Sequence, residues 1–288
     1  MAGSFTKKRI QVNISLASGT FDGSNNTIQL QGLRVECHVK KGGHPSKNEC
    51  KLKVYGLSDA DMNKLTTMPS KDKNALVVHK SIVQVLAGDS DGMAVVFSGN
   101  IVSAFAAYQS PPNLAFEVTA MEGYYPSIAP SKPKSFKGVT QVSTILKTLA
   151  GEMGYSYEDG GVDATLNSPI LEGSAWAQAS EVADSCDLEF GADDGVMFAA
   201  PRHGVRSGYV PLISPDSGLR EYPVFDKEGL RFSCLYNPAL RLGGAVSVKS
   251  AVKVACGTWR IHGLDHQLES ENPNGKWFSD VRATWIGS

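Results

Sequence analysis

The segment Arg9-Ile10-Gln11-Val12-Asn13-Ile14-Ser15-Leu16 decides the fold class, because polar and apolar residues alternate along it without a break. Side chains of a β-strand point alternately to opposite faces, so this period of two predicts a strand with one buried face. The alternation returns between Ile28 and Val39, after the turn-rich loop 19–26, and its phase slips at Gly32. A slip of one residue at a glycine predicts a β-bulge.

Alternation of this kind recurs along most of the chain. Further strands are predicted at 50–54, 76–86, 94–106, 114–120, 188–190, 196–198, 230–236, 246–256, 259–261 and 277–285. The last four are expected to form a meander, which leaves exposed edges unless it closes on itself or pairs with another chain. Asp89-Ser90-Asp91-Gly92 resembles half of a calcium loop but lacks the later ligands, so we interpret it as a hairpin turn.

Three segments have helical features instead. Ser58 is placed to cap a short helix that ends at Leu65, and Ser174 is placed to cap a second one with Trp176, Ala179, Ala183 and Cys186 on one stripe. Apolar residues at helical spacing predict a third helix over 142–153, stopped by Gly154. Asp193-Asp194-Gly195 is a hairpin turn signal.

These patterns predict a mainly β protein with a small α/β insertion. The first 122 residues hold about six strands, enough to close a small barrel. A proline-containing stretch separates them from the helical region. The predicted division is therefore a first tube-like β-barrel at 1–123, a linker at 124–134, an acidic α/β insertion at 135–205 and a second β-barrel at 206–288.

Composition excludes several classes of protein. The 288 residues carry a formal net charge of −1, whereas nucleic-acid-binding domains usually have a strong basic excess. Hydrophobic residues make up 42% and charged residues 20%, which is typical of a globular protein and not of a disordered one. No run of about 18 apolar residues predicts a membrane-spanning helix.

Charge is unevenly distributed along the sequence. Residues 1–55 have a net charge of +6, whereas residues 151–200 contain eleven acids and no Lys or Arg. The acidic block suggests a separately folded module with a solvated face. An alternative interpretation is that basic and acidic surfaces of neighbouring subunits dock on each other.

Five widely spaced cysteines, without a C-x-x-C motif, argue against a disulfide scaffold. We expect Cys37, Cys50, Cys186, Cys234 and Cys256 to be reduced and mostly buried. The N-terminal segment lacks the apolar block of a secretory signal, so synthesis in a reducing cytoplasm is expected.

The sequence contains no motif that identifies a catalytic, cofactor-binding or metal-binding residue. His262 and His266 lie in a strand pattern, where four residues span about 13 Å, too far for two ligands of one zinc ion. Glu152, Glu158 and Asp159 invite a glycosidase interpretation, which requires two carboxylates across a cleft. We expect Trp259, Trp277 and Trp285 to be core or strand-face residues, with a sugar-binding platform as the alternative.

The order of several motifs resembles the baseplate hub, or tail-tip hub, proteins of tailed bacteriophages, which are related to the late-control protein D group and the base of type VI secretion spikes. The similar segments are Val54-Tyr55-Gly56-Leu57-Ser58, the strand core Phe97-Ser98-Gly99-Asn100-Ile101, the helix 139–154, the link at 213–218 and 222–223, and the closing strands 242–250, 257–270 and 277–278.

The resemblance implies a structural protein without enzymatic activity or cofactor. It implies that each subunit has two tube-like barrels, so that a homotrimer presents a pseudo-sixfold ring around a channel for DNA. The implied partners are the tail tube or distal tail protein, the central spike or tip protein, other baseplate proteins and the tape-measure protein. The implied location is the virion tail, after assembly in the host cytoplasm.

Two other functions stay open at this point. One is a tail-associated peptidoglycan hydrolase that uses acidic residues of the middle domain, such as Glu152 or Glu158. The other is a carbohydrate-binding β-protein that uses Trp259 or Trp285.

Overall fold

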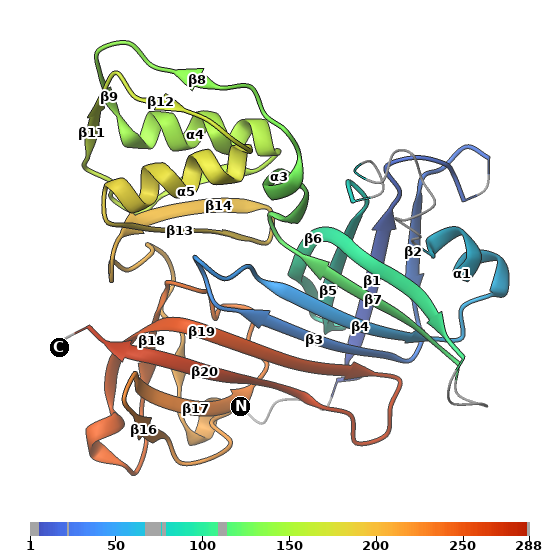
Figure 1. Cartoon of the computed structure of the whole chain (residues 1–288). Coiled ribbons are helices and arrows are strands. Elements are labelled where there is room, and N and C mark those ends of the chain that lie inside the picture. Colours follow the sequence, from blue (N-terminus) through green and yellow to red (C-terminus); the bar gives the residue numbers. More distant parts are fainter. Residues whose placement is uncertain (1–5, 22, 67–75, 77–78, 109–113, 287–288) are drawn as a thin grey trace. The chain divides into compact units, whose positions relative to one another are not determined.

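The computed structural model describes residues 6–21, 23–66, 76, 79–108 and 114–286. Its contacts divide the chain into two compact units (Figure 1). Unit 1 comprises Met1–Val39, Glu49–Met121 and His266–Phe278, and unit 2 comprises Lys40–Asn48, Glu122–Asp265 and Ser279–Ser288.

Most of the described elements are strands. In chain order the elements are β1 (Arg9–Ser15), β2 (Thr27–Gln31), β3 (Val35–Lys41), β4 (Glu49–Tyr55), α1 (Asp59–Leu65), β5 (Ile82–Asp89), β6 (Gly92–Ala107), β7 (Ala115–Met121), α3 (Tyr124–Ile128), β8 (Lys134–Ser135), β9 (Val139–Gln141), α4 (Val142–Met153), β10 (Ser156–Asp159), β11 (Thr165–Asn167), β12 (Ile170–Leu171), α5 (Ala175–Ser185), β13 (Leu188–Asp193), β14 (Val196–Pro201), β15 (Leu212–Ile213), η1 (Pro215–Ser217), β16 (Val224–Asp226), β17 (Gly229–Leu235), β18 (Ala245–Val248), η2 (Lys253–Ala255), β19 (Gly257–Ser270) and β20 (Trp277–Trp285). The predicted mainly β class with a small α/β part is confirmed.

Unit 1 is built on one sheet with the strand order β3-β4-β7-β6-β5-β1-β2. Alternate residues of its strands are buried, as the period-two pattern predicts, and β1 buries Ile10, Val12 and Ile14. Phe97 and Phe116 are the largest of the fully buried side chains in this unit. The apolar face of the sheet therefore forms the core of unit 1.

The long strand β6 contains the bulges of this sheet. Register shifts leave Val96 as an extra residue opposite β5 and Val102 as an extra residue opposite β7. Bulges increase local bending and twist, so one strand of 16 residues can pair with two differently placed neighbours. The bulge predicted at Gly32 is wrong: Gly32 has a φ of 73° and lies in the turn between β2 and β3.

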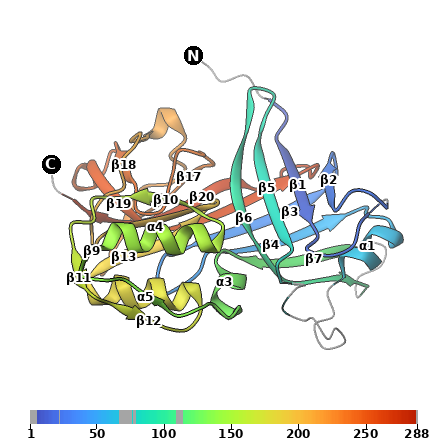
Figure 2. The same ribbon diagram turned by 90° about the horizontal axis from the view of Figure 1, so that it is seen from above.

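The helical part of unit 2 has its own core. Helix α4 buries Val142, Ile145 and Leu149 along one face and ends at Gly154, whose φ of 82° is favoured by glycine. Ser174 caps α5 by accepting a hydrogen bond from the N–H of Ala177. Figure 2 shows α4 and α5 side by side, and they pack with the antiparallel hairpin β13–β14, to which β10 adds in parallel.

The remainder of unit 2 is built on the strand order β16-β17-β20-β19, with β18 paired to β19 and β15 paired to β18. The predicted four-strand meander is only partly correct. Strands β18, β19 and β20 pair in chain order, but β17 pairs with β20 and not with β18. The strand predicted over 246–256 is also too long. Strand β18 ends at Val248, and Val252 to Cys256 form and flank the short helix η2.

Several local predictions are confirmed. Ser58 caps α1, with Met62 and Leu65 buried. The turn at Asp89–Gly92 closes the β5–β6 hairpin, although β5 begins at Ile82 and part of the strand predicted from residue 76 lies outside the described residues. All five cysteines are free, and three of them are buried. Among the described residues, the helices are all too short or too polar to span a membrane.

Candidate functional site

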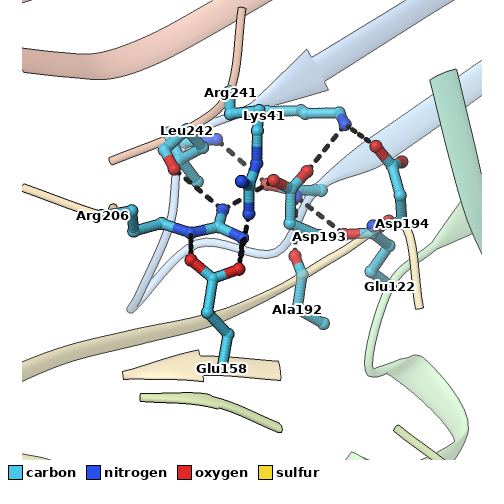
Figure 3. A network of polar contacts seen from close by, with 11 residues as sticks. Lys41, Glu122, Glu158, Ala192, Asp193, Asp194, Arg206, Arg241 and Leu242 are labelled. Atoms are coloured by element: carbon cyan, nitrogen blue, oxygen red, sulfur yellow. Dashed lines mark hydrogen bonds and ion pairs between the residues drawn. The ribbon is translucent and has the colours of Figure 1, made fainter. Parts of the chain in front are cut away.

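Unit 2 contains a buried network of charged side chains (Figure 3). The side chain of Lys41, the last residue of β3, is 4% exposed, and its Nζ lies 2.7 Å from Asp193 Oδ1 and 2.8 Å from Asp194 Oδ2. Burial alone would lower the pKa of Lys41, but the two carboxylates outweigh burial and raise it. Lys41 is therefore a charged ammonium that holds the β13–β14 turn.

The geometry of this turn follows from its sequence. Two-residue hairpin turns whose central residues both have positive φ favour Asp-Gly, because glycine and aspartate tolerate that conformation. Asp194 has a φ of 57° and Gly195 a φ of 89°. The tight turn places the carboxylates of Asp193 and Asp194 close enough together to share one lysine.

Arg206 is the second cation of the network, and its side chain is 2% exposed. Its guanidinium binds Glu158 at two points, with Nε–Oε1 at 3.0 Å and Nη2–Oε2 at 2.7 Å. Nη1 donates to Asp193 Oδ2 at 2.7 Å and to the carbonyl oxygen of Leu242 at 2.9 Å. Because the N–H donors of a guanidinium have a rigid arrangement, they fix the positions of the groups that they bind and also neutralise the charge of the carboxylates. Arg206 therefore connects β10, the β13–β14 turn and the segment before β18.

Glu122 and Asn48 complete the network from two other segments. The backbone N–H of Asp194 donates to Glu122 Oε1 at 2.7 Å, and Asn48 Nδ2 donates to Glu122 Oε2 at 2.7 Å. Asn48 Nδ2 also donates to the carbonyl oxygen of Ala192 at 2.8 Å. Burial raises the pKa of Glu122 well above its ordinary value, although Lys41 opposes the shift.

The network is close to charge balance. It contains four carboxylates, of Glu122, Glu158, Asp193 and Asp194, and three cations, of Lys41, Arg206 and Arg241. Burial would raise the pKa of Asp193, but Lys41 and Arg206 hold it at about 2. The pKa of Asp194 is raised by burial, and the neighbouring Asp193 adds to this shift. A proton retained by Glu122 would balance the remaining charge.

The acidic block of the sequence is largely neutralised within unit 2. Six of the eleven acids at 151–200 form ion pairs with Lys or Arg from other segments of this unit, namely Glu152, Glu158, Asp187, Glu189, Asp193 and Asp194. By sequence count, unit 2 has a formal charge of −1 and unit 1 of 0. The local charge of the sequence is therefore not the charge of either folded unit.

Each unit also has a hollow over a sheet face lined by mixed charges. In unit 1 a hollow of about 320 Å³ lies over β3, β4, β7 and the end of β19, and it contains the Lys53–Glu117 pair, at 3.1 Å. In unit 2 a hollow of about 500 Å³ lies over β16, β17 and β20, and it contains the Arg231–Asp226 pair, at 3.7 Å. Both surfaces carry acidic and basic side chains in similar number.

A comparison with known protein families identifies the chain. Residues 9–277 match the family described as baseplate hub gp41. The chain belongs to this baseplate hub family. The resemblance inferred from the order of the sequence motifs is thereby confirmed. The comparison with curated protein sequences gave no match.

Solved structures similar to this chain include tail proteins and a type VI secretion protein. A tail protein from Neisseria meningitidis MC58 has a TM-score of 0.64 at 11% identity, covering 96% of this chain and 97% of that one. The 43 kDa tail protein of prophage MuSo2 from Shewanella oneidensis has a TM-score of 0.62 at 7% identity, covering 97% and 96%. The c3393 protein of E. coli, a type VI secretion component, has a TM-score of 0.56 at 9% identity, covering 87% and 73%. At such low identity these similarities concern the fold.

The acidic residues considered for catalysis have structural contacts in the hub. Glu158 is bound by Arg206 and Arg241, which outweigh burial and lower its pKa. Glu152 contacts Lys134 and Ser131, and its pKa is also lowered although burial opposes this. Asp159 accepts hydrogen bonds from backbone N–H groups of the loop that follows it. A glycosidase general acid requires a raised pKa, the opposite of what Glu152 and Glu158 have.

The histidines and tryptophans considered for metal or sugar binding lie on strands. His262 and His266 are both in β19, and the described residues contain no group of three or more potential ligands arranged around a metal position. Trp259 is 5% exposed and belongs to the apolar core formed by β17, β18, β19 and β20, as predicted. Trp285 is half-exposed and packs edge-on against Trp259, with ring centroids 4.9 Å apart.

The sequence did not reveal the buried network. The Asp193-Asp194-Gly195 signal predicted the turn, but not the lysine that lies 152 positions earlier in the chain. Arg206 falls in the loop-rich stretch after β14, where no periodic pattern identifies an inward-facing side chain. The one signal in the sequence was the pair Asp193-Asp194, because two neighbouring carboxylates in a tight turn favour a cation close to both of them.

Proposed function

We propose that the chain is a structural hub whose three copies form a pseudo-sixfold ring. In this proposal, each subunit supplies two barrel-like β modules, with the predicted boundaries 1–123 and 206–288, joined through the linker 124–134 and the α/β insertion 135–205. The observation that carries the proposal is the baseplate hub family match over residues 9–277. Six modules in a ring can match a hexameric tail tube or distal tail protein on one side and a threefold spike or tip protein on the other.

Unpaired strand edges support an assembly of several copies. Strand β2 ends the strand order of unit 1, and β16 ends that of unit 2. Edge strands offer unsatisfied backbone N–H and C=O groups to a further strand. Pairing of such edges between subunits would satisfy these groups and close the ring.

The ring would surround a channel through which DNA passes. Tight binding of DNA needs many uncompensated Lys and Arg contacts with phosphates. The near-neutral units and the mixed charges of their hollowed sheet faces instead suit transient passage. In this proposal the insertion lies outside the ring, where other baseplate proteins and the tape-measure protein can be neighbours, and the location is the virion tail after assembly in the host cytoplasm.

Electron microscopy of intact particles tests the proposal. Averaged images are expected to place the chain around the tail axis with threefold symmetry, at three copies of 30.8 kDa each. Fivefold or sixfold placement of the chain would contradict it.

The proposed role is structural, without catalysis. A zymogram on bacterial cell wall should show no clearing by the purified full-length chain. Clearing that is lost in Glu152→Gln or Glu158→Gln would instead support the hydrolase, and glycan binding lost in Trp285→Ala would support a carbohydrate-binding protein.

A further inference from the structure

Three exposed apolar side chains of unit 2 lie around the buried ring of Trp259. Val254 in η2 is 74% exposed, Trp285 in β20 is 50% exposed and Phe225 in β16 is 49% exposed. The ring centroids of Phe225 and Trp285 lie 6.1 and 4.9 Å from that of Trp259. The indole N–H of Trp259 donates to the carbonyl oxygen of Ala255, the neighbour of Val254, at 3.0 Å. The three exposed side chains therefore form one surface, which we call the Trp285 patch.

The ring of Trp285 has an exposed polar group as well as apolar area. It lies against the backbone of Gly257, where an added Cβ would be 2.6 Å from Trp285 Cζ3. Its indole N–H donates to no acceptor in the part of the chain that the structure describes. An aromatic ring that combines apolar area with a free N–H favours the boundary between lipid and water.

Two exposed lysines flank the patch. Lys249 follows β18 and Lys253 begins η2, and neither forms an ion pair with a described residue. The sequence has no Asp or Glu between residues 229 and 264. The other Lys and Arg residues of this stretch are in ion pairs, namely Arg231, Arg241 and Arg260. The ammonium groups of Lys249 and Lys253 are therefore available for an anionic group beside the patch.

The acids near β16 in the sequence lie on the other face of that strand. Val224 and Asp226 line the hollow of about 500 Å³, whereas Phe225, between them, contacts Trp259 on the opposite face. The hollow also contains the charged neighbours of β16, both acidic and basic, namely Glu221, Lys227, Glu228 and Arg231. Asp216 lies in η1, after β15, and pairs with neither Lys249 nor Lys253. The charge beside the Trp285 patch is therefore positive.

We infer that the Trp285 patch binds the surface of an anionic lipid bilayer. Exposed apolar side chains enter the interfacial layer of a bilayer, while nearby lysines are attracted by its negative headgroups. A lipid phosphate can accept hydrogen bonds both from an indole N–H and from lysine ammonium groups, so one chemical group meets all the polar needs of the patch. The inference goes beyond the proposed ring, because every residue of the patch belongs to unit 2 of a single copy.

Co-sedimentation of the full-length chain with lipid vesicles tests the charge requirement. The chain should bind vesicles of phosphatidylcholine and phosphatidylglycerol, bind pure phosphatidylcholine much more weakly, and dissociate as salt is added. Lys249→Gln combined with Lys253→Gln should weaken binding to the anionic vesicles by at least about tenfold. Lys147→Gln is the matched control, because Lys147 is exposed on α4 and forms no ion pair with a described residue.

A second pair of variants tests the apolar contact. Val254→Ser should weaken binding to the anionic vesicles several-fold, and because Val254 is 74% exposed the fold should tolerate the change. Val139→Ser is the matched control, since Val139 in β9 is 73% exposed and lies outside the patch. If Val254→Ser and Val139→Ser bind as tightly as the wild type, the patch does not contact the bilayer.

Tryptophan fluorescence locates the contact on the molecule. Phosphatidylglycerol with brominated acyl chains should quench part of the emission of the bound wild type. Trp285→Phe keeps an aromatic ring at this position and should still bind, but without this quenching. Trp259 and Trp176 are 5% and 7% exposed and should contribute little to it. Quenching that persists in Trp285→Phe would place the bilayer on another surface and overturn the inference.

The remaining outcomes also contradict the inference. Absence of binding to the anionic vesicles at low ionic strength shows that the patch has no affinity for lipid. If the chain instead self-associates in the absence of vesicles and Val254→Ser abolishes this, the patch is a contact between copies. Neither result bears on the proposed ring, which the symmetry of the chain in intact particles tests separately.

Discussion

Unit 2 buries some of its ion pairs, whereas the ion pairs of the described part of unit 1 are all partly exposed. In unit 1 the Lys53–Glu117 pair has side chains 49% and 33% exposed, whereas in unit 2 the Lys41–Asp193 pair has side chains 4% and 3% exposed. Exposed ion pairs contribute little to stability, but removal of one partner from a buried pair leaves an uncompensated charge. Unit 1 is therefore held mainly by apolar packing, and unit 2 additionally by a charged junction between distant segments.

The largest effect is expected from Arg206→Met. The substitution leaves Asp193 and Glu158 without the guanidinium that both carboxylates contact. Loss of one partner of a buried ion pair typically costs about 3–5 kcal/mol, so the free energy of unfolding should fall by about that amount. Urea denaturation followed by circular dichroism measures the change.

Arg202→Met is the matched control for this substitution. Arg202 pairs with Asp187, but the two side chains are 52% and 77% exposed. Its loss should change the free energy of unfolding by less than about 1 kcal/mol. If the two variants lose equal stability, burial is not the reason that the contacts of Arg206 stabilise unit 2.

The second prediction concerns the pH dependence of stability. Burial raises the pKa of Glu122 in the folded state, while Lys41 opposes this and Asp193 and Asp194 add to it. A carboxyl with a raised folded pKa stabilises the fold below its unfolded pKa, and this contribution is lost as the pH rises through the folded pKa. The wild type should therefore lose stability from about pH 5 upward, by about 1.4 kcal/mol for each tenfold difference in proton affinity between the folded and unfolded carboxyl.

Glu122→Gln removes this titration and should reduce the slope over the same pH range, while the raised pKa of Asp194 contributes the slope that remains. Urea denaturation at several pH values measures both slopes, and the comparison uses slopes because the substitution also alters the hydrogen bonds from Asn48 and Asp194. Glu181 lies exposed on α5, away from this network, so Glu181→Gln should keep the wild-type slope. Parallel curves for wild type and Glu122→Gln would show that the buried carboxyl does not retain its proton.

The third prediction examines the apolar packing of unit 1. A Cβ atom added at Gly99 in β6 would lie 2.6 Å from Phe97 Cζ and 2.9 Å from the carbonyl oxygen of Met121. Overpacking of a filled core typically costs about 1–3 kcal/mol, so Gly99→Ala should lower the free energy of unfolding by that order. Gly92→Ala, in the same strand with no atom within 4 Å of the added Cβ, should cost much less.

This prediction also explains part of the sequence pattern. The Phe97-Ser98-Gly99-Asn100-Ile101 segment, used as a family motif, contains a glycine because no side chain fits between Phe97 and Met121. If Gly99→Ala and Gly92→Ala were equally stable, the motif would need another explanation.

Local patterns predicted the elements better than their pairing. Alternation identified β1, and capping residues identified α1 and α5, because these features depend on neighbours in the sequence. The position of β17 beyond β20 depends on contacts between distant segments, which local alternation does not encode. Gly32 was interpreted as a bulge since a turn between two strands produces the same slip in phase.

The buried network of charged side chains in unit 2 could not be predicted from the sequence, for a related reason. Acids at 151–200 suggested an acidic surface, because counting along the sequence cannot show that Lys41 and Arg206 fold back onto them. A buried charge has no periodic signature of its own, and its partner can lie anywhere in the chain. The sequence therefore predicted the hub family through ordered motifs, while the residues that hold unit 2 together emerged only from the structure.

The smallest effect is expected at the exposed pair of unit 1. A double-mutant cycle with Lys53→Gln and Glu117→Gln should give a coupling energy of about 0.2–1 kcal/mol, because solvent screens both groups. The coupling should also shrink at high salt, unlike the effect of Arg206→Met. A coupling energy as large as the loss caused by Arg206→Met would show that exposed charges on the sheet face of unit 1 stabilise it as strongly as the buried junction stabilises unit 2.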